Sequence, residues 1–125
     1  AEYLVSKLYD AEKTKNGTAG CDLITHDNCK VEVKGRVSRK EGYIPKTYIN
    51  DTNVTGEHFD YLVYVVFTTD YDIERAYGMT INTFKKVSEY VKHNNSAPKW
   101  KFKASLDLLE HEDIDNLTKY LAEHQ

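Results

Sequence analysis

The sequence has few cysteines and prolines, two of each among its 125 residues. Cys21 and Cys29 cannot build the dense disulfide framework of a small secreted domain. No signal-peptide pattern opens the sequence, so we expect free thiols and a cytoplasmic protein. Apolar runs long enough to cross a bilayer are also missing, and no membrane association is predicted.

An excess of positive charge is missing too, because 17 Lys and Arg stand against 20 Asp and Glu, for a net charge of −3. Any contact with a polyanion must therefore rest on a local basic patch. Glycine-rich phosphate loops, dinucleotide fingerprints and serine nucleophile elbows do not occur. Cys21, His26 and Cys29 lack a fourth ligand and the paired C-x-x-C spacing, which argues against zinc.

What the chain does contain fits one globular domain over residues 1–125, either alone or as a module of a larger protein. The hydrophobic share of 40% and the charged share of 30% are ordinary for such a domain. Stretches of helical and strand periodicity follow one another along the chain. They predict an α/β fold with a mixed central β-sheet flanked by helices.

Helical spacing of apolar residues predicts helices over residues 2–13, 83–93 and about 112–122, the second capped by Thr80 or Asn82. Alternating or continuous apolar runs predict strands over 21–25, 29–39, 43–49, 59–67, 73–79 and 100–104. The nearly unbroken apolar run 59–67 is expected in the centre of the sheet, and 100–104 at an edge. Residues 50–53 are expected to form a loop.

The sequence Val31-Glu32-Val33-Lys34-Gly35 places an acid and a lysine two residues apart on a predicted strand. Side chains alternate along a strand, so Glu32 and Lys34 share one face while the valines take the other. A three-residue turn at 26–28 would set Asp22 opposite Glu32, whereas a two-residue turn would aim Asp22 at the core. We predict an odd-numbered loop or a bulge.

These residues resemble the PD-(D/E)xK nuclease superfamily, which has the restriction-endonuclease-like fold. The resemblance runs through residues 20–24 and 31–36, and covers roughly the first half of the chain. Residues 1–5 and 59–65 look like the first helix and a later core strand of that family. Cys21 departs from the pattern, because proline usually precedes the acid.

The resemblance implies a Mg²⁺-dependent nuclease that hydrolyses phosphodiester bonds, most often in DNA, in restriction, repair or mobile-element systems. Asp22 and Glu32 would hold Mg²⁺, or Mn²⁺ in its place, together with the backbone carbonyl of Val33. Lys34 would orient or deprotonate the attacking water, or stabilise the charged transition state. An ion pair on a solvated strand face is the simpler alternative.

A glutamate of the first helix touches the metal in several branches of the same family. This makes Glu2 a candidate ligand, with Glu12 as its competitor on the same predicted helical stripe. A solvated helix face would explain both residues equally well.

A basic stretch follows Lys34 along the chain. Phosphate contacts give affinity without reading the base sequence, and such residues serve that purpose. We therefore predict nucleic-acid contacts at four positions: Arg36, Ser38, Lys40 and Lys46. An ordinary charged strand face is the alternative.

Two other functions fit the sequence. The chain would be a binding module if it kept the nuclease fold and lacked activity. It would be a protein-interaction domain if its ten tyrosines and the acidic C-terminal helix formed an interface. Family members commonly act as homodimers or as fusions to other modules, and the resemblance implies one or the other here.

Overall fold

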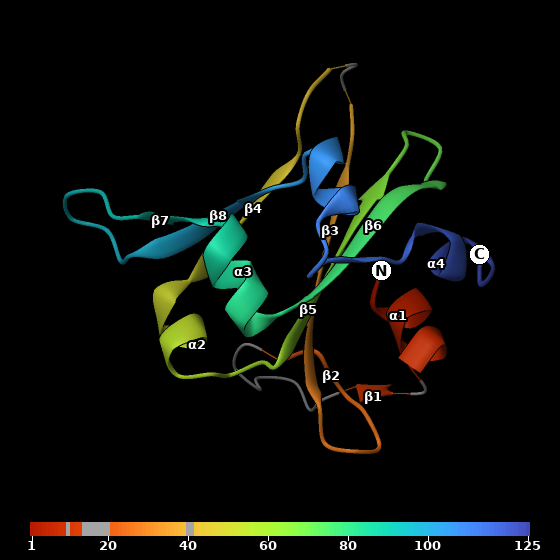
Figure 1. The fold of residues 1–125 in the computed structure, drawn as a ribbon, viewed down its shortest axis with the longest axis horizontal. Coiled ribbons are helices and arrows are strands. Elements are labelled where there is room, and N and C mark those ends of the chain that lie inside the picture. The colour runs from red at the N-terminus through yellow and green to blue at the C-terminus, as the bar shows by residue number, and fades with distance from the viewer. Residues whose placement is uncertain (10, 14–20, 40–41) are drawn as a thin grey trace.

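The computed structural model describes residues 1–9, 11–13, 21–39 and 42–125 (Figure 1). Its helices are α1 Glu2–Tyr9, α2 Asp51–Thr55, α3 Ile81–Val87, the 3₁₀ helix η1 Leu106–Glu110 and α4 Thr118–Ala122. Its strands are β1 Glu12–Lys13, β2 Leu23–Ile24, β3 Lys30–Val37, β4 Lys46–Asn50, β5 Tyr61–Phe67, β6 Ile73–Thr80, β7 Glu89–Val91, β8 Lys99–Lys103 and β9 Asp115–Asn116. Within these residues no helix is long and apolar enough to cross a membrane.

The main sheet contains six strands in the order β1-β2-β3-β5-β6-β9. β3 and β5 run parallel, and the other neighbouring pairs are antiparallel. The prediction of an α/β fold with a mixed sheet is therefore confirmed. β5 lies between β3 and β6, and its residues 62–66 are fully buried, as the unbroken apolar run predicts.

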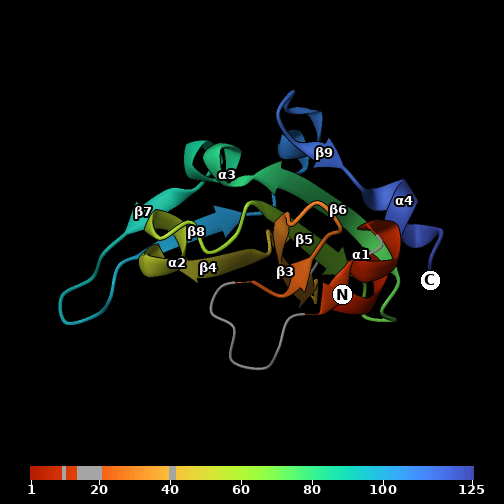
Figure 2. The ribbon, with the colours of Figure 1, turned by 90° about the horizontal axis from the view of Figure 1, so that it is seen from below.

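Two hydrophobic cores form on the two faces of this sheet, because β5 is apolar on both. Val63 and Val65 pack with residues of α1 and α4 on one face. Leu62, Tyr64 and Val66 pack on the other face against α3 and a second sheet. Figure 2 shows α1 and α4 at one side of the main sheet and α2, α3 and the second sheet at the other.

The second sheet has three antiparallel strands in the order β4-β8-β7. Its inward side chains, among them Thr47, Ile49 and Phe102, are almost fully buried against the core. The prediction of an edge strand at 100–104 is wrong. β8 is the middle strand of this sheet, since β4 and β7 pair with its two sides.

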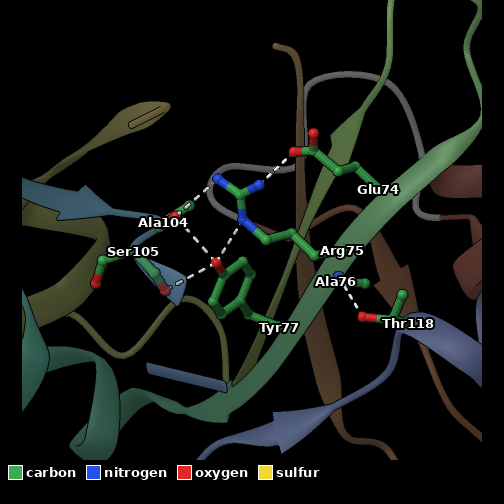
Figure 3. Close-up of polar contacts among 7 residues, drawn as sticks. All are labelled: Glu74, Arg75, Ala76, Tyr77, Ala104, Ser105 and Thr118. Carbon is green, nitrogen blue, oxygen red and sulfur yellow. Dashed lines mark hydrogen bonds and ion pairs between the residues drawn. The ribbon is translucent and has the colours of Figure 1, made fainter. Parts of the chain in front are cut away.

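A buried polar cluster closes the junction between the two sheets (Figure 3). The Oη of Tyr77 donates to the backbone oxygens of Ala104 and Ser105, both at 2.9 Å, and accepts from Nε of Arg75 at 2.8 Å. The same guanidinium group donates to the Ala104 oxygen at 3.0 Å and pairs with Glu74. These bonds connect the middle of β6 to the end of β8.

The three predicted helices are shorter in the structure than the periodicity suggests. α1 ends at Tyr9, and residues 12–13 pair with β2. α3 begins after Thr80, whose hydroxyl accepts from the Thr83 N–H at 3.3 Å, so that capping prediction is confirmed. It ends at Val87, because residues 89–91 pair with β8.

The last predicted helix survives only as α4, because residues 115–116 pair with β6. The predicted loop at 50–53 is also wrong, since α2 begins at Asp51. The short strand expected within 43–49 begins at Lys46. In each case pairing with a segment distant in sequence decides the boundary.

Candidate functional site

The β2–β3 hairpin determines where Asp22 lies. Leu23 pairs with Val31 and Ile24 with Lys30, and the Thr25 N–H donates to the Cys29 oxygen at 3.0 Å. Residues 26–28 are left as a three-residue turn. The odd-numbered loop is therefore confirmed. Continued by one residue, this register would set Asp22 across from Glu32.

Local polar contacts explain why the turn takes this form. Asn28 has a positive φ of 65°, a conformation that asparagine tolerates better than most residues. The Thr25 hydroxyl accepts from the Cys29 N–H at 3.0 Å and donates to the Asp27 carboxylate. These bonds hold the loop at three residues and so fix the register of the hairpin.

The regular ladder breaks at Asp22. Its N–H donates to the Val31 oxygen at 3.0 Å, and its Oδ2 accepts from the Val33 N–H at 2.8 Å. A side-chain carboxylate thus replaces a backbone carbonyl as the partner of Val33. The neighbouring Cys21 is buried, and its Sγ donates to the Leu23 oxygen at 3.2 Å. The thiol thus bonds the backbone on the other side of Asp22, at the position where the PD-(D/E)xK pattern has a proline.

Glu32 lies beside Asp22 and is only 6% exposed. Burial, together with the hydrogen bond and negative charge of Asp22, raises the pKa of Glu32 to about 8, while Lys34 opposes the shift. Two carboxyl groups in contact cannot both ionise without cost. Near neutral pH Glu32 therefore favours its protonated form.

Lys34 follows on the same face of β3 as Glu32. The parallel register pairs Glu32 with Leu62 and Lys34 with Tyr64, so both charged residues lie on the face that meets the second sheet. Val31 and Val33 are buried on the opposite face with α1 and α4. The predicted separation of valines from charged residues on this strand is confirmed.

The donor set of the pair suits a hard divalent cation, since carboxylate oxygens are the preferred ligands of Mg²⁺. Among the residues with described positions, no group of three or more His, Cys, Asp or Glu side chains comes together. Asp22 and Glu32 would therefore be the acidic ligands of such an ion. The carbonyl of Val33 stays a predicted ligand.

Glu2 lies on the α1 side of β3. It lines a broad open groove of about 1160 Å³ together with Gly35, Arg36 and Arg39. Glu12, its competitor, belongs to β1 and pairs with Ile24. The structure thus places the two glutamates in different elements, and a role for Glu2 in holding metal stays a prediction.

The predicted nucleic-acid contacts that the structure describes come from two different sheets. Arg36 and Ser38 lie in or next to β3, and the Ser38 N–H donates to the Phe67 oxygen at 2.8 Å. Lys46 belongs to the second sheet, opposite Lys103. Lys40 falls outside the described residues.

Sequence reasoning missed the other basic residues around Lys46. Lysines alternate with aromatic residues through β8, at positions 99, 101 and 103. The same alternation that indicates a strand also predicts one basic face, and this signal was present in the sequence.

No protein-family model matches the chain, and no curated protein matches it. A functional argument therefore rests on the residues and their geometry.

Proposed function

We propose that this protein is a metal-dependent nuclease with a restriction-endonuclease-like fold that hydrolyses phosphodiester bonds in DNA. One observation carries the proposal: Asp22 and Glu32 share a contact across a hairpin, and Lys34 follows on the same strand face. Two acids and an ammonium group in this order provide the groups that phosphodiester hydrolysis needs.

The two carboxyl groups would hold the cation. The Val33 N–H fixes the orientation of the Asp22 carboxylate through its bond to Oδ2. Glu32 would lose its proton when the cation binds. The positive charge of the cation would then offset the repulsion between the Asp22 and Glu32 carboxylates. When bound, Mg²⁺ would supply the positive charge that polarises a phosphodiester oxygen and acidifies a water molecule.

Lys34 would act on the reacting phosphate or on the attacking water. Its charge lowers the pKa of Glu32, so its ammonium group acts within the electrostatic reach of the carboxyl pair. An ammonium group held there would hydrogen-bond the water or stabilise negative charge that develops on the phosphate oxygens. Its half-buried position limits the water around it and strengthens that charge interaction.

The proposal is tested by incubating supercoiled plasmid and single-stranded DNA with the protein over a Mg²⁺ or Mn²⁺ titration. Cleavage is expected only with metal, and Lys34→Ala should lower its rate about 10²-fold or more, as loss of a general acid–base group does. Lys119→Ala changes an exposed lysine of α4 and should cleave like the wild type.

Binding of Mn²⁺, measured by calorimetry, separates ligands from the catalytic ammonium group. Asp22→Asn and Glu32→Gln should weaken Mn²⁺ binding, whereas Lys34→Ala should retain it. Wild-type protein that binds DNA in EDTA and never cleaves with either metal would instead identify a binding module.

A further inference from the structure

Four lysines gather on the outer face of the second sheet. The strand register sets Lys46 opposite Lys103, Tyr48 opposite Lys101, and Val91 beside Lys99. The alternate side chains of β4 and β8, such as Ile49 and Phe102, are buried, so the lysines point away from the core. We call this surface the lysine face: Lys46, Tyr48, Lys99, Lys101 and Lys103.

This arrangement is unfavourable for the fold by itself. Like charges directly opposite each other destabilise an antiparallel pair, and Lys46 and Lys103 are such a pair. The lysines of β8 repeat every second residue, roughly 6.7 Å apart along the strand. Among the paired positions of this face Glu89 alone is acidic, with its Oε2 3.1 Å from Nζ of Lys101. The face therefore carries an excess of positive charge that would suit an external polyanion.

Tyr48 lies among the lysines of this face, and its side chain is 44% exposed. Beside it is a small depression of about 250 Å³, lined by residues that include Val91, His93 and Lys99. A flat aromatic group among lysines is the combination that binds single-stranded nucleic acid, where bases stack and phosphates pair with the cations. Clustered lysines also suit an anionic lipid surface, so the vesicle comparison below distinguishes the two partners.

We propose that the lysine face binds the phosphate backbone of a single nucleic-acid strand, with a base stacked on Tyr48. The lysine face belongs to the second sheet. Glu32 lies in β3 of the main sheet, and Asp22 directly precedes β2 of the same sheet. The choice of nucleic acid over another polyanion rests on the proposed nuclease function. The surface would supply affinity that the net charge of −3 does not provide.

The first test measures binding of a fluorescent single-stranded oligonucleotide in EDTA as a function of salt. The triple variant Lys99→Gln, Lys101→Gln, Lys103→Gln should bind about tenfold or more weakly. Its slope of log K against log salt should fall by about 2, since each lost phosphate contact removes about 0.7. The matched control is the triple variant Lys7→Gln, Lys86→Gln, Lys119→Gln, which removes equal charge elsewhere. It should retain most of the affinity and most of the salt slope. Equal losses in the two variants would overturn the proposal.

Charge reversal at Lys103 separates binding from folding. Lys103→Glu converts the repulsive pair with Lys46 into an attractive one, so the melting temperature should hold or rise. Oligonucleotide affinity should nevertheless fall. A variant with unchanged affinity would overturn the proposal. Tyr48→Ala should also weaken binding and leave the salt slope unchanged, because a stacked ring releases no counterion.

Two comparisons distinguish this surface from its alternatives. If phosphatidylserine vesicles bind through the same lysines and the oligonucleotide does not, the partner is a membrane surface and the proposal fails. Because binding is measured without metal, lysine-dependent binding by a protein that never cleaves would support this surface and contradict only the nuclease. If the triple variant still cleaves DNA and binds the oligonucleotide with unchanged affinity, the nuclease is supported and the role of the lysine face is overturned.

Discussion

The backbone N–H of Val33 donates a hydrogen bond to Oδ2 of Asp22 at 2.8 Å, where a regular ladder would offer a carbonyl. Val33 is itself buried on the face of β3 that packs against the helices α1 and α4. The orientation of the carboxylate is therefore held by a residue of the core. This contact places Asp22 against Glu32, and it links the packing of one face of β3 to the charged residues of the other.

The Glu32 carboxyl group makes stability depend on pH. Its pKa is raised from 4.5 to about 8, so between those values the folded protein binds more protons than the unfolded chain. Without metal, the contribution of Glu32 to the free energy of unfolding should be complete below about pH 4.5. It should fall by on the order of a few kcal/mol as the pH rises through about 8. Urea denaturation between pH 5 and pH 9 measures this loss.

Glu32→Gln and Asp22→Asn isolate the origin of that dependence. The first variant removes the titrating group. The second removes the negative charge of Asp22, which raises the pKa of Glu32. Both should flatten the decline of stability between pH 5 and pH 9. A wild-type decline that persists in Glu32→Gln would assign the effect to other groups.

Metal binding should release a proton from the same pair. At pH 7 Glu32 is mostly protonated, because its pKa is about 8, and a carboxylate must be deprotonated to ligate a cation. Calorimetric titration with Mn²⁺ in buffers of different ionisation enthalpy should show close to one proton released per ion at pH 7. The release should fall well below one at pH 9. A release that does not change with pH would mean that Glu32 is not a ligand.

The hairpin could be predicted because its signals are local. Valines alternate with charged residues from Val31 to Lys34, and the polar residues at 26–28 favour a short turn that sets the register. The mixed sheet follows from the succession of helical and strand periodicities, and the apolar run 59–67 places its central strand. The contact between Asp22 and Glu32 is thus within reach of sequence reasoning.

Element boundaries and the lysine face depend on pairing between distant segments. Val87 and Val91 suit one side of a helix, yet residues 89–91 leave it to pair with β8. The cost of a shortened helix is offset by ladder bonds that the local sequence does not announce. Lys46 and Lys103 lie 57 positions apart in the sequence and become neighbours only through the β4–β8 register.

Tyr64 and Tyr77 provide a matched pair for measuring a buried hydroxyl group. Both side chains are fully buried and their rings are 6.4 Å apart. The Tyr77 hydroxyl bonds Arg75 and two backbone oxygens, whereas the Tyr64 hydroxyl has no hydrogen-bond partner among the described residues. Tyr77→Phe should lower the free energy of unfolding by about 1–3 kcal/mol, because it leaves buried polar groups unsatisfied.

Tyr64→Phe is the control, and it should be neutral or stabilising. It removes a buried hydroxyl whose pKa burial raises to about 12, without breaking a hydrogen bond among the described residues. Chemical denaturation of the two variants under one condition measures the difference. Equal destabilisation would show that the Tyr64 hydroxyl has a partner in solution.

Gly78 allows Tyr61 to lie across β6. A methyl group at Gly78 would be 2.2 Å from the Tyr61 hydroxyl and 2.7 Å from Cδ1 of Leu117. The tyrosine cannot easily move, since its hydroxyl bonds Asp115 and its ring packs edge-on against Tyr9. Gly78→Ala should therefore cost about 1–3 kcal/mol of stability through overpacking.

The double variant Tyr61→Phe, Gly78→Ala shows whether this contact is the cause. Removing the hydroxyl takes away the nearest atom, so the double variant should lose less stability than the sum of the two single variants. Gly42→Ala gives a comparison, because its methyl group would meet no atom of the described residues within 4 Å, while its φ of 76° opposes the change. Strictly additive losses in urea denaturation would mean that Leu117, and with it the start of α4, sets the limit on side-chain size at Gly78.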